Sequence, residues 1–212
     1  MIRPILIAVE GIDGAGKSTQ IPRIAAWFAR HGIETDTSCE PTHGPLGTKI
    51  RTAPVRLAPA EERRLFVEDR RDHLQDRLLP AIARGAVAIT DRYFYSSVAY
   101  QGTRRDAFDH EPSDAELARL QDEIYAENRA FAPEADVLVY IRLDVDTALA
   151  RMRASREGLD PFENRRNLLD VAAAFERIVT RHPCVITADA TKSPDEVTAE
   201  IERGLDRIFT EK

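Results

Sequence analysis

Cysteine is scarce in this sequence. The two cysteines, Cys39 and Cys184, form no CxxC pair, and no two histidines stand at an HxxxH spacing. The spacing of these residues therefore predicts no metal cage. Cys39 follows a run of alternating residues and Cys184 precedes one, so we expect both to be small apolar side chains near strand ends. Two unpaired cysteines also fit a reducing compartment.

Long apolar runs and an excess of positive charge are missing as well. No stretch of about 18 apolar residues occurs, so we expect no membrane-spanning helix. The first residues contain one early arginine and no small-residue cleavage site, so they do not resemble a signal peptide. Lys and Arg number 30 against 36 Asp and Glu, a net charge of −6. Because non-specific nucleic-acid binding needs a basic stripe, we expect neither nucleic acid nor a membrane as a partner, and a cytoplasmic location.

What the chain does contain is a regular alternation of short apolar segments with longer amphipathic ones. This pattern is typical of a parallel sheet covered by helices on both faces. Three of the candidate strands are almost continuously apolar, as expected for strands buried on both sides. The predicted strands are residues 5–9, 34–39, 86–90, 137–143 and 184–187. No repeat or linker divides the 212 residues, so we predict one α/β domain over residues 1–212 with a five-stranded parallel sheet.

The amphipathic segments predict helices, among them residues 17–30 and 61–84. Ser113 and Ser193 are each followed three residues later by a glutamate, and both therefore predict a capping box that opens a helix. The apolar residues that set the helical period are Leu74, Leu78 and Ile82 in residues 61–84, and Val197, Ile201, Leu205 and Ile208 in the last helix.

Residues 11–18 read Gly-Ile-Asp-Gly-Ala-Gly-Lys-Ser and match the pattern G-x-x-x-x-G-K-[ST] between an apolar strand and a helix. Glycines let the backbone wrap around phosphate oxygens, and successive amide hydrogens offer positive charge to them. We expect Lys17 to reach the β- and γ-phosphates of ATP and Ser18 to help hold Mg²⁺. The alternative is a glycine-rich turn that matches by chance. The predicted ATP-binding residues are Gly11, Ile12, Asp13, Gly14, Ala15, Gly16, Lys17, Ser18 and Thr19.

A carboxylate, Asp91, ends the apolar segment 86–90. Parallel strands present their C-terminal ends to a phosphate site, so we predict that Asp91 is the second residue on the Mg²⁺ side, acting through a water. A helix N-cap is the alternative, and the two roles are compatible.

The residues after Asp91 carry a second pattern. If a helix begins at Arg92, then Arg92, Ser96 and Tyr100 lie on one face, with Ser97 and Gln101 beside them. Such a face combines a guanidinium, hydroxyl groups and a ring. This composition is typical of a binding surface rather than of a core stripe.

Four segments together resemble the thymidylate kinase family. Residues 91–102 read D-R-Y-F-Y-S-S-V-A-Y-Q-G, and they join the loop 11–19, residues 40–44 (E-P-T-H-G) and residues 65–70 (L-F-V-E-D-R) in order along nearly the whole chain. The resemblance implies a P-loop nucleoside-monophosphate kinase fold with a short lid. It also implies transfer of the γ-phosphoryl group of Mg·ATP to dTMP, and a homodimer formed through helices beside the sheet, for which residues 61–84 are the candidate.

The resemblance further implies roles in the acceptor site. Asp13 would hold the sugar 3′-hydroxyl, and Arg92 would clamp the acceptor phosphate. Phe66 would stack on thymine while Arg70 bonds its carbonyl edge; a core Phe66 and a surface Arg70–Glu pair are the alternatives. Ser97 would meet the base edge, Tyr100 would stand beside C2′, and Cys39 replaces an arginine that many members carry. The predicted dTMP-binding residues are Asp13, Glu40, Pro41, Phe66, Arg70, Arg92, Ser96, Ser97, Tyr100 and Gln101.

Residues 151–167 are rich in charge and contain Gly158 and Pro161, which predicts a mobile loop between helices. This segment resembles the family's lid. Some members carry an arginine at the position of Gly14, and others supply catalytic arginines from the lid. Gly14 places this chain with the second type, with Arg153 and Arg156 as candidates and Arg151 less strongly favoured; a solvated charged face is the alternative. The predicted catalytic residues are Lys17, Asp13, Arg92, Arg153 and Arg156.

Other functions remain to be weighed. The acceptor could be another nucleoside monophosphate, such as uridylate, or a nucleoside. A GTP-binding switch would need a D-x-x-G loop and an N-K-x-D motif, but Asp91 is followed by Arg-Tyr-Phe, and residues 191–195 (T-K-S-P-D) match poorly. An inactive scaffold is disfavoured because the catalytic residue types are present. No activated Cys or Ser–His pair is seen, so we expect direct in-line transfer.

Overall fold

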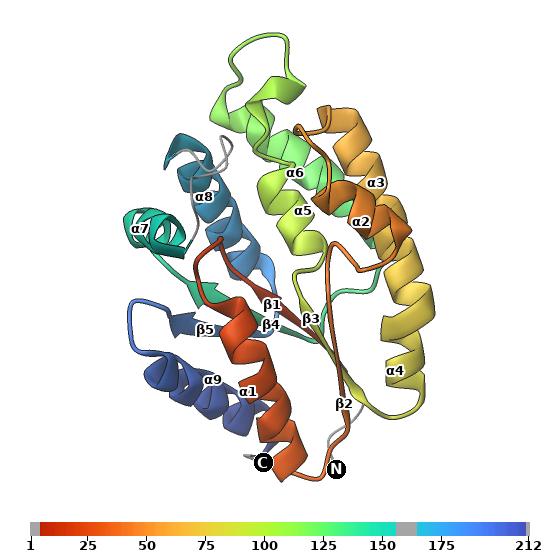
Figure 1. The fold of residues 1–212 in the computed structure, drawn as a ribbon, viewed down its shortest axis with the longest axis vertical. Helices are drawn as coiled ribbons and strands as arrows, with labels where there is room; N and C mark the ends of the chain where they lie inside the picture. The colour runs from red at the N-terminus through yellow and green to blue at the C-terminus, as the bar shows by residue number, and fades with distance from the viewer. Residues whose placement is uncertain (1–4, 156–164, 211–212) are drawn as a thin grey trace.

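The computed structural model describes residues 5–155 and 165–210. Its centre is a sheet of five parallel strands in the order β2-β3-β1-β4-β5 (Figure 1). The strands are β1 (Leu6–Glu10), β2 (Thr35–Cys39), β3 (Val87–Asp91), β4 (Val137–Arg142) and β5 (Val185–Asp189). The predicted α/β class and all five predicted strands are confirmed, with ends that shift by one or two residues.

Helices surround this sheet. Helices α1 and α9 lie side by side, and α5, α6 and α8 form a second group (Figure 1). A π-helical turn, Leu74–Leu78, joins α3 to α4, so the predicted helix 61–84 is present in three pieces. The helices are α1 (Lys17–Arg30), α2 (Pro45–Arg51), α3 (Pro59–His73), α4 (Leu79–Ala83), α5 (Phe94–Tyr100), α6 (Asp114–Arg129), α7 (Val145–Ser155), α8 (Arg165–Arg181) and α9 (Pro194–Phe209).

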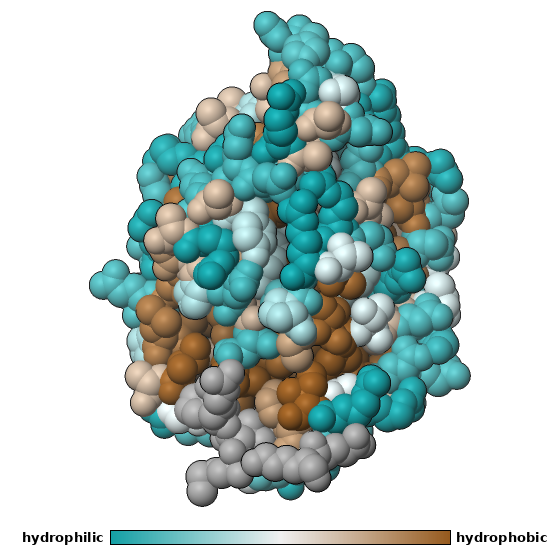
Figure 2. Space-filling model, turned by 180° about the vertical axis from the view of Figure 1, so that it is seen from behind, coloured by the Kyte–Doolittle hydropathy of each residue, from teal (hydrophilic) through white to brown (hydrophobic). Residues whose placement is uncertain are grey.

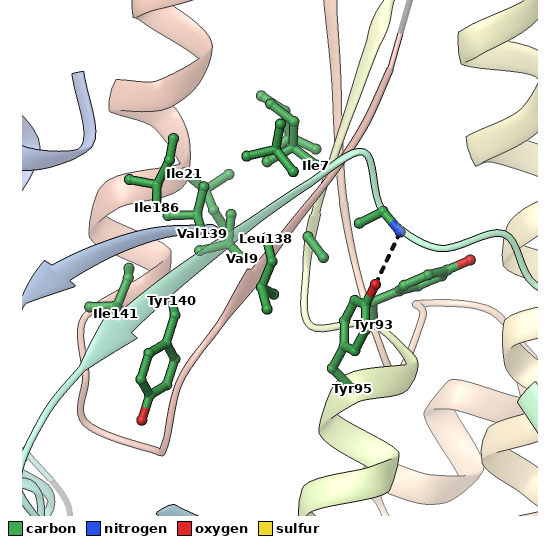
Figure 3. Packing of buried hydrophobic residues seen from close by; sticks show 14 of the residues in the cluster. Ile7, Val9, Ile21, Tyr93, Tyr95, Leu138, Val139, Tyr140, Ile141 and Ile186 are labelled. Atoms are coloured by element: carbon green, nitrogen blue, oxygen red, sulfur yellow. Dashed lines mark hydrogen bonds between the residues drawn. The ribbon is translucent and has the colours of Figure 1, made fainter. Parts of the chain in front are cut away.

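Alternate residues of β4 pack against the two helical groups. Val139 pairs in register with Ile186 of β5, and Ile186 lies against α9. The next residue, Tyr140, points to the opposite side of the sheet, where its ring centroid is 5.8 Å from that of Phe175 in α8. Figure 3 shows Val139 and Tyr140 diverging in this way. Because successive side chains of a strand alternate, the apolar strands predicted from the sequence bury both faces of the sheet.

Local signals in the sequence place several helix ends correctly. In both predicted capping boxes the serine hydroxyl accepts the glutamate N–H, and the glutamate carboxylate accepts the serine N–H. Val197, Ile201 and Leu205 of α9 are buried, whereas Ile208, near its end, is 37% exposed. Both cysteines are free and half-buried at or beside strand ends.

Two expectations about boundaries are wrong. Residues 151–167 are not a loop throughout, because α7 continues to Ser155 and α8 begins at Arg165. Leu149 and Met152 are buried against the core, and this apolar contact extends α7 into the charged segment. Gly158 and Pro161 lie outside the described residues. Helix α5 also begins at Phe94 rather than at Arg92, whose φ of 70° is not helical.

The surface opposite to the view of Figure 1 is uneven in polarity. Hydrophilic side chains dominate its upper half, and hydrophobic ones gather in patches in its lower half (Figure 2). Among the described residues, the exposed large hydrophobic side chains are Val55, Leu79, Leu169 and Ile208. Among the helices described, none has both the length and the apolar character that a membrane crossing requires.

A close approach between α9 and β5 gives a stability prediction. A Cβ at Gly204 would lie 2.6 Å from Cγ2 and 2.8 Å from Cγ1 of Ile186. We expect Gly204→Ala to lower the free energy of unfolding by about 1–2 kcal/mol, because overpacking outweighs the gain in helix propensity. Urea denaturation measures this change. Arg203→Ala, at the exposed neighbouring position, is the control; an equal or greater stability of Gly204→Ala would contradict the packing argument.

Candidate active site

The phosphate-binding loop runs from the end of β1 into α1. Gly11 has a φ of 148°, and a Cβ there would lie 2.5 Å from the carbonyl oxygen of Ile141 in β4. Only glycine fits this position without displacing β4. Lys17 is 7% exposed, and its Nζ donates to the carbonyl oxygens of Gly11 (2.9 Å) and Ile12 (3.2 Å). The ammonium group is therefore held inside the curve of the loop.

The charges around Lys17 favour a dense anion. Burial lowers the pKa of Lys17 to about 8, and the positive charge of Arg92 acts in the same direction. Asp13, Asp91 and Glu10 oppose this shift. Two neighbouring cations repel each other, and a polyanion placed between them relieves that repulsion. The loop is therefore suited to phosphate groups.

Asp91 and Ser18 offer a place for a hard cation. The register of the sheet sets Asp91 opposite Val9, which brings it to the start of the loop. The Ser18 hydroxyl donates to Oδ2 of Asp91 (3.2 Å), while Oδ1 is buried and, in the described chain, accepts no hydrogen bond. An orphaned carboxylate oxygen beside a hydroxyl fits Mg²⁺, which prefers oxygen ligands.

Such an ion would depend on other oxygens as well. Within the described residues, no group of three or more His, Cys, Asp or Glu side chains is placed to hold a metal. Mg²⁺ commonly takes one or two protein ligands and completes its shell with waters and substrate phosphates. The two residues predicted from the sequence, Ser18 and Asp91, fit that mode of binding.

Arg92 lies in a backbone conformation that is uncommon for a residue with a Cβ. Its N–H donates to the carbonyl oxygen of Val9 (3.0 Å), and its own carbonyl oxygen accepts the Thr90 hydroxyl (2.7 Å). The guanidinium donates to Ser96 Oγ (3.0 Å) and lies 4.9 Å from the ring centroid of Tyr100. The structure thus brings Arg92, Ser96 and Tyr100 together, but Arg92 reaches them from the turn before α5.

Asp13 connects the loop to this cluster. Its Oδ1 accepts Arg92 Nη2 (2.6 Å), and its Oδ2 accepts the Tyr100 hydroxyl (3.0 Å). Burial raises the pKa of Asp13, but Arg92, Lys17 and the hydrogen bonds outweigh it and hold the pKa below its usual value. Asp13 and Tyr100 also line a cleft of about 750 Å³. Asp13 is therefore an ionised side chain facing a ligand-sized space.

Arg70 is buried in a polar network of side chains. Its exposed fraction is 1%, and its Nε and Nη2 lie 2.8 and 2.6 Å from Glu40 Oε2. The other nitrogen donates to Asn128 Oδ1 (2.5 Å), and Nη2 also donates to Ser97 Oγ (3.0 Å). Glu40 Oε1 lies 3.0 Å from His73 Nδ1. The surface Arg–Glu pair considered as an alternative is therefore wrong, and both oxygens of Glu40 are occupied by protein side chains.

The remaining acceptor candidates lie close to this network. Pro41 follows Glu40 in a cis peptide, and the turn is anchored by Thr42, whose N–H donates to Asp69 (2.8 Å). Phe66 is half-buried on α3, one turn before Arg70, so it is not a fully buried core residue. Gln101, after the last turn of α5, is buried.

The lid candidates are only partly described. Arg156 lies outside the described residues, and Arg153 is exposed on α7. Arg151 donates to the carbonyl oxygens of Gly14 (3.2 Å) and Ala190 (2.7 Å). Arg151, which the sequence favoured less, thus touches the phosphate-binding loop directly.

Two arginines of the cleft, Arg51 and Arg104, were not predicted from the sequence. Arg51, at the end of α2, donates to the carbonyl oxygen of Pro41 and lies beside His43. Arg104 is 5% exposed, donates to the carbonyl oxygen of Leu57 (2.8 Å) and pairs with Glu62 and Asp106. Both line the cleft with Asp13. No motif or spacing marks them, because loop folding alone brings them there.

The buried ion pair gives a second stability prediction. Glu40→Ala leaves the Arg70 charge buried without its counter-ion, which costs about 3–5 kcal/mol of unfolding free energy. Chemical denaturation measures the loss. Glu61→Ala removes the exposed pair with Lys49 (3.2 Å) and serves as the matched control, with an expected change below about 1 kcal/mol. If the two substitutions lowered the free energy of unfolding equally, burying Arg70 without its counter-ion would carry no extra cost, and the prediction would be wrong.

Known proteins are similar to this chain over most of its length. The model of the thymidylate kinase family matches residues 9–201. A thymidylate kinase from Xanthomonas euvesicatoria pv. vesicatoria is 42% identical over 188 residues, which covers 88% of this chain and 77% of the relative. A thymidylate kinase from Akkermansia muciniphila is 36% identical over 206 residues, covering 96% of this chain and 92% of the relative. The chain therefore belongs to the thymidylate kinase family.

Proposed function

We propose that the protein transfers the γ-phosphoryl group of Mg·ATP to dTMP, producing dTDP and ADP. The observation that carries this proposal is the ion pair between Asp13 of the phosphate-binding loop and Arg92 (2.6 Å), beside a cleft of about 750 Å³. The pair supports the proposal because Arg92, the candidate for the acceptor phosphate, lies directly beside the loop proposed to bind the donor phosphates. Membership of the family supports thymidylate as the acceptor.

On the donor side, the loop amides and Lys17 bind the terminal phosphates of ATP. Ser18 and Asp91 would hold Mg²⁺, which would neutralise charge on the terminal phosphates when bound. Among the described residues, the Lys17 ammonium bonds backbone carbonyl oxygens and no carboxylate, so it can turn toward phosphate oxygens without breaking an ion pair there. This supports a role for Lys17 in stabilising negative charge on the phosphoryl group during its transfer.

On the acceptor side, Arg92 binds the dTMP phosphate and Asp13 accepts the 3′-hydroxyl of the sugar. Tyr100 flanks the sugar, and Phe66, Arg70, Ser97 and Gln101 contact the base. The acceptor phosphate is already anionic, so the reaction needs no strong general base. Catalysis then rests on holding the two phosphates in line and on offsetting charge as it spreads over the transferred group.

Glu40 acts in this scheme through Arg70. One of its oxygens bonds Arg70 and the other bonds His73, and the exposed fraction of Glu40 is 5%. The guanidinium of Arg70 is therefore fixed before any ligand binds, which reduces the entropy that base recognition must overcome. The proposed part of Glu40 and Pro41 is to shape the acceptor pocket.

The acceptor is identified by an ADP-release assay with Mg·ATP and each nucleoside monophosphate or nucleoside in turn. We expect dTMP to give the highest kcat/KM. A higher value for uridylate or for a nucleoside would reassign the acceptor. Binding of GTP in preference to ATP, with no acceptor turned over, would favour the switch protein instead.

The position of Lys17 in the phosphate-binding loop gives a prediction about catalysis. Lys17→Ala should lower kcat by about 10³-fold or more, because no other loop side chain carries a positive charge to the phosphates. Steady-state assays with saturating ATP and dTMP measure this. Lys49→Ala, in an exposed surface pair on α2, is the matched control and should retain full activity. Substantial turnover by Lys17→Ala would remove Lys17 from the mechanism.

The lid arginines give a further prediction. The double substitution Arg153→Ala with Arg156→Ala should reduce kcat by about 10³-fold while nucleotide affinity changes little, because a lid arginine acts mainly on the transition state. Arg151→Ala is measured in parallel, since Arg151 contacts the loop. If only Arg151→Ala lowers kcat, the catalytic role moves to Arg151; if neither variant does, the charged segment is a solvated surface.

Two expectations about partners and place stay predictions. A homodimer through the helices beside the sheet is implied by the resemblance, and sedimentation velocity tests it. A cytoplasmic location is tested by fractionation of cells that express the protein.

A further inference from the structure

Glu10 is a buried carboxylate that the proposed reaction does not use. It is the last residue of β1, directly before the phosphate-binding loop, and its exposed fraction is 0%. Its Oε1 accepts the backbone N–H groups of Tyr93 (2.8 Å) and Ser96 (3.2 Å), and its Oε2 accepts the Ser96 hydroxyl (2.6 Å). One side chain of β1 therefore holds the first turn of α5 by three hydrogen bonds.

The segment held in this way includes the unfavourable turn at Arg92. A φ of 70° is rarely adopted by a residue with a Cβ, so neighbouring contacts must hold it. The Thr90 hydroxyl donates to the Arg92 carbonyl oxygen (2.7 Å). Glu10 accepts the N–H of Tyr93 (2.8 Å), which belongs to the same peptide unit. Thr90 and Glu10 thus hold the peptide that follows Arg92 from its carbonyl side and its N–H side.

Ser96 links Glu10 to the guanidinium itself. The Ser96 hydroxyl donates its hydrogen to Glu10 and accepts Arg92 Nη1 (3.0 Å). The carboxylate thereby fixes the rotation of the hydroxyl so that a lone pair faces Arg92. Arg92 Nη2 bonds Asp13, so a chain of contacts runs from β1 through α5 and back to the loop.

We propose that Glu10 and Thr90 are positioning residues that hold Arg92 in register with the phosphate-binding loop, so that the acceptor phosphate meets the donor phosphate in line. Glu10 touches no ligand in this scheme, because its oxygens are buried and occupied by α5. The inference rests on the proposed function, since it assigns Arg92 to the acceptor phosphate. The inference predicts that substitutions of Glu10 or Thr90 weaken binding of dTMP more than binding of ATP.

Four substitutions separate the contacts. Glu10→Gln retains Oε1 as an acceptor for the two N–H groups but replaces the oxygen that accepts from Ser96. Glu10→Ala removes the helix cap as well. Thr90→Val removes the hydroxyl with little change of shape, and Thr90→Ser restores it. Asp136→Asn is the matched control, because the Asp136 carboxylate accepts the N–H of Leu6 (2.9 Å) at the opposite end of β1.

We expect Glu10→Gln and Thr90→Val to raise the KM for dTMP about tenfold, the effect of losing one buried hydrogen bond, with the KM for ATP changed less than about twofold. Thr90→Ser should restore the KM, and Asp136→Asn should leave it unchanged. Glu10→Gln should add little in a Ser96→Ala background, because both act on the same contact. If Glu10→Ala fails to fold, Glu10→Gln and Thr90→Val still decide the question.

A second readout does not depend on turnover. NMR of the Arg92 side-chain N–H signals reports how firmly the guanidinium is held, and we expect Glu10→Gln and Thr90→Val to speed its exchange with water. An unchanged KM for dTMP in both variants, or an equal rise in the KM for ATP, would overturn the inference. A different outcome would overturn the proposed function and not this inference. In that outcome the unaltered protein does not turn over dTMP, although Glu10 still slows the exchange of the Arg92 side-chain N–H groups with water.

Discussion

The contact on which the site depends is the ion pair between Arg92 and Asp13. It joins residues 79 positions apart in the sequence, at 2.6 Å, and it exists because β1 and β3 are neighbours in a parallel sheet. Their C-terminal ends meet at one edge, so the loop after β1 and the turn after β3 face each other. A charge of each sign is thereby fixed at this edge of the sheet. Removing the parallel pairing would separate the two halves of the site, the loop after β1 and the turn after β3.

Buried polar networks hold the two halves in place. Arg70, Glu40, His73 and Asn128 form one network, and Glu10 with Ser96 forms another. Burying such groups costs free energy, and each network offsets this cost through hydrogen bonds between its members. Burial raises the pKa of Glu10 to about 7, although Arg92 and the hydrogen bonds to Ser96 and Tyr93 oppose the shift. The gain is rigidity: side chains that face the cleft have little freedom left to lose on binding.

Cys39 stands directly before Glu40, where the resemblance noted in the sequence led us to expect an arginine. Its thiol lies against the carbonyl oxygen of Pro41 and the ring of His43. Arg51 approaches the same turn from α2 and also lines the cleft. A positive charge is therefore present beside Glu40 and Pro41, although it comes from another element. Burial and the charge of Asp91 raise the pKa of Cys39, so its thiol stays protonated.

The sequence alone determined the five strands, the helical segments 17–30 and 61–84, the phosphate-binding loop and the two capping boxes. All of these follow from local patterns: apolar period, glycine spacing, and a serine three residues before a glutamate. It did not determine that Arg92 leaves the helix or that Glu10 caps α5. Nor did it determine that Ser18 donates to Asp91, that Asn128 bonds Arg70, or that Arg51 and Arg104 line the cleft. Those contacts join distant segments, and nothing in a local pattern encodes which side chains a folded chain brings together. Only the tertiary structure decided them, because sheet order and helix packing set which buried polar groups must satisfy one another.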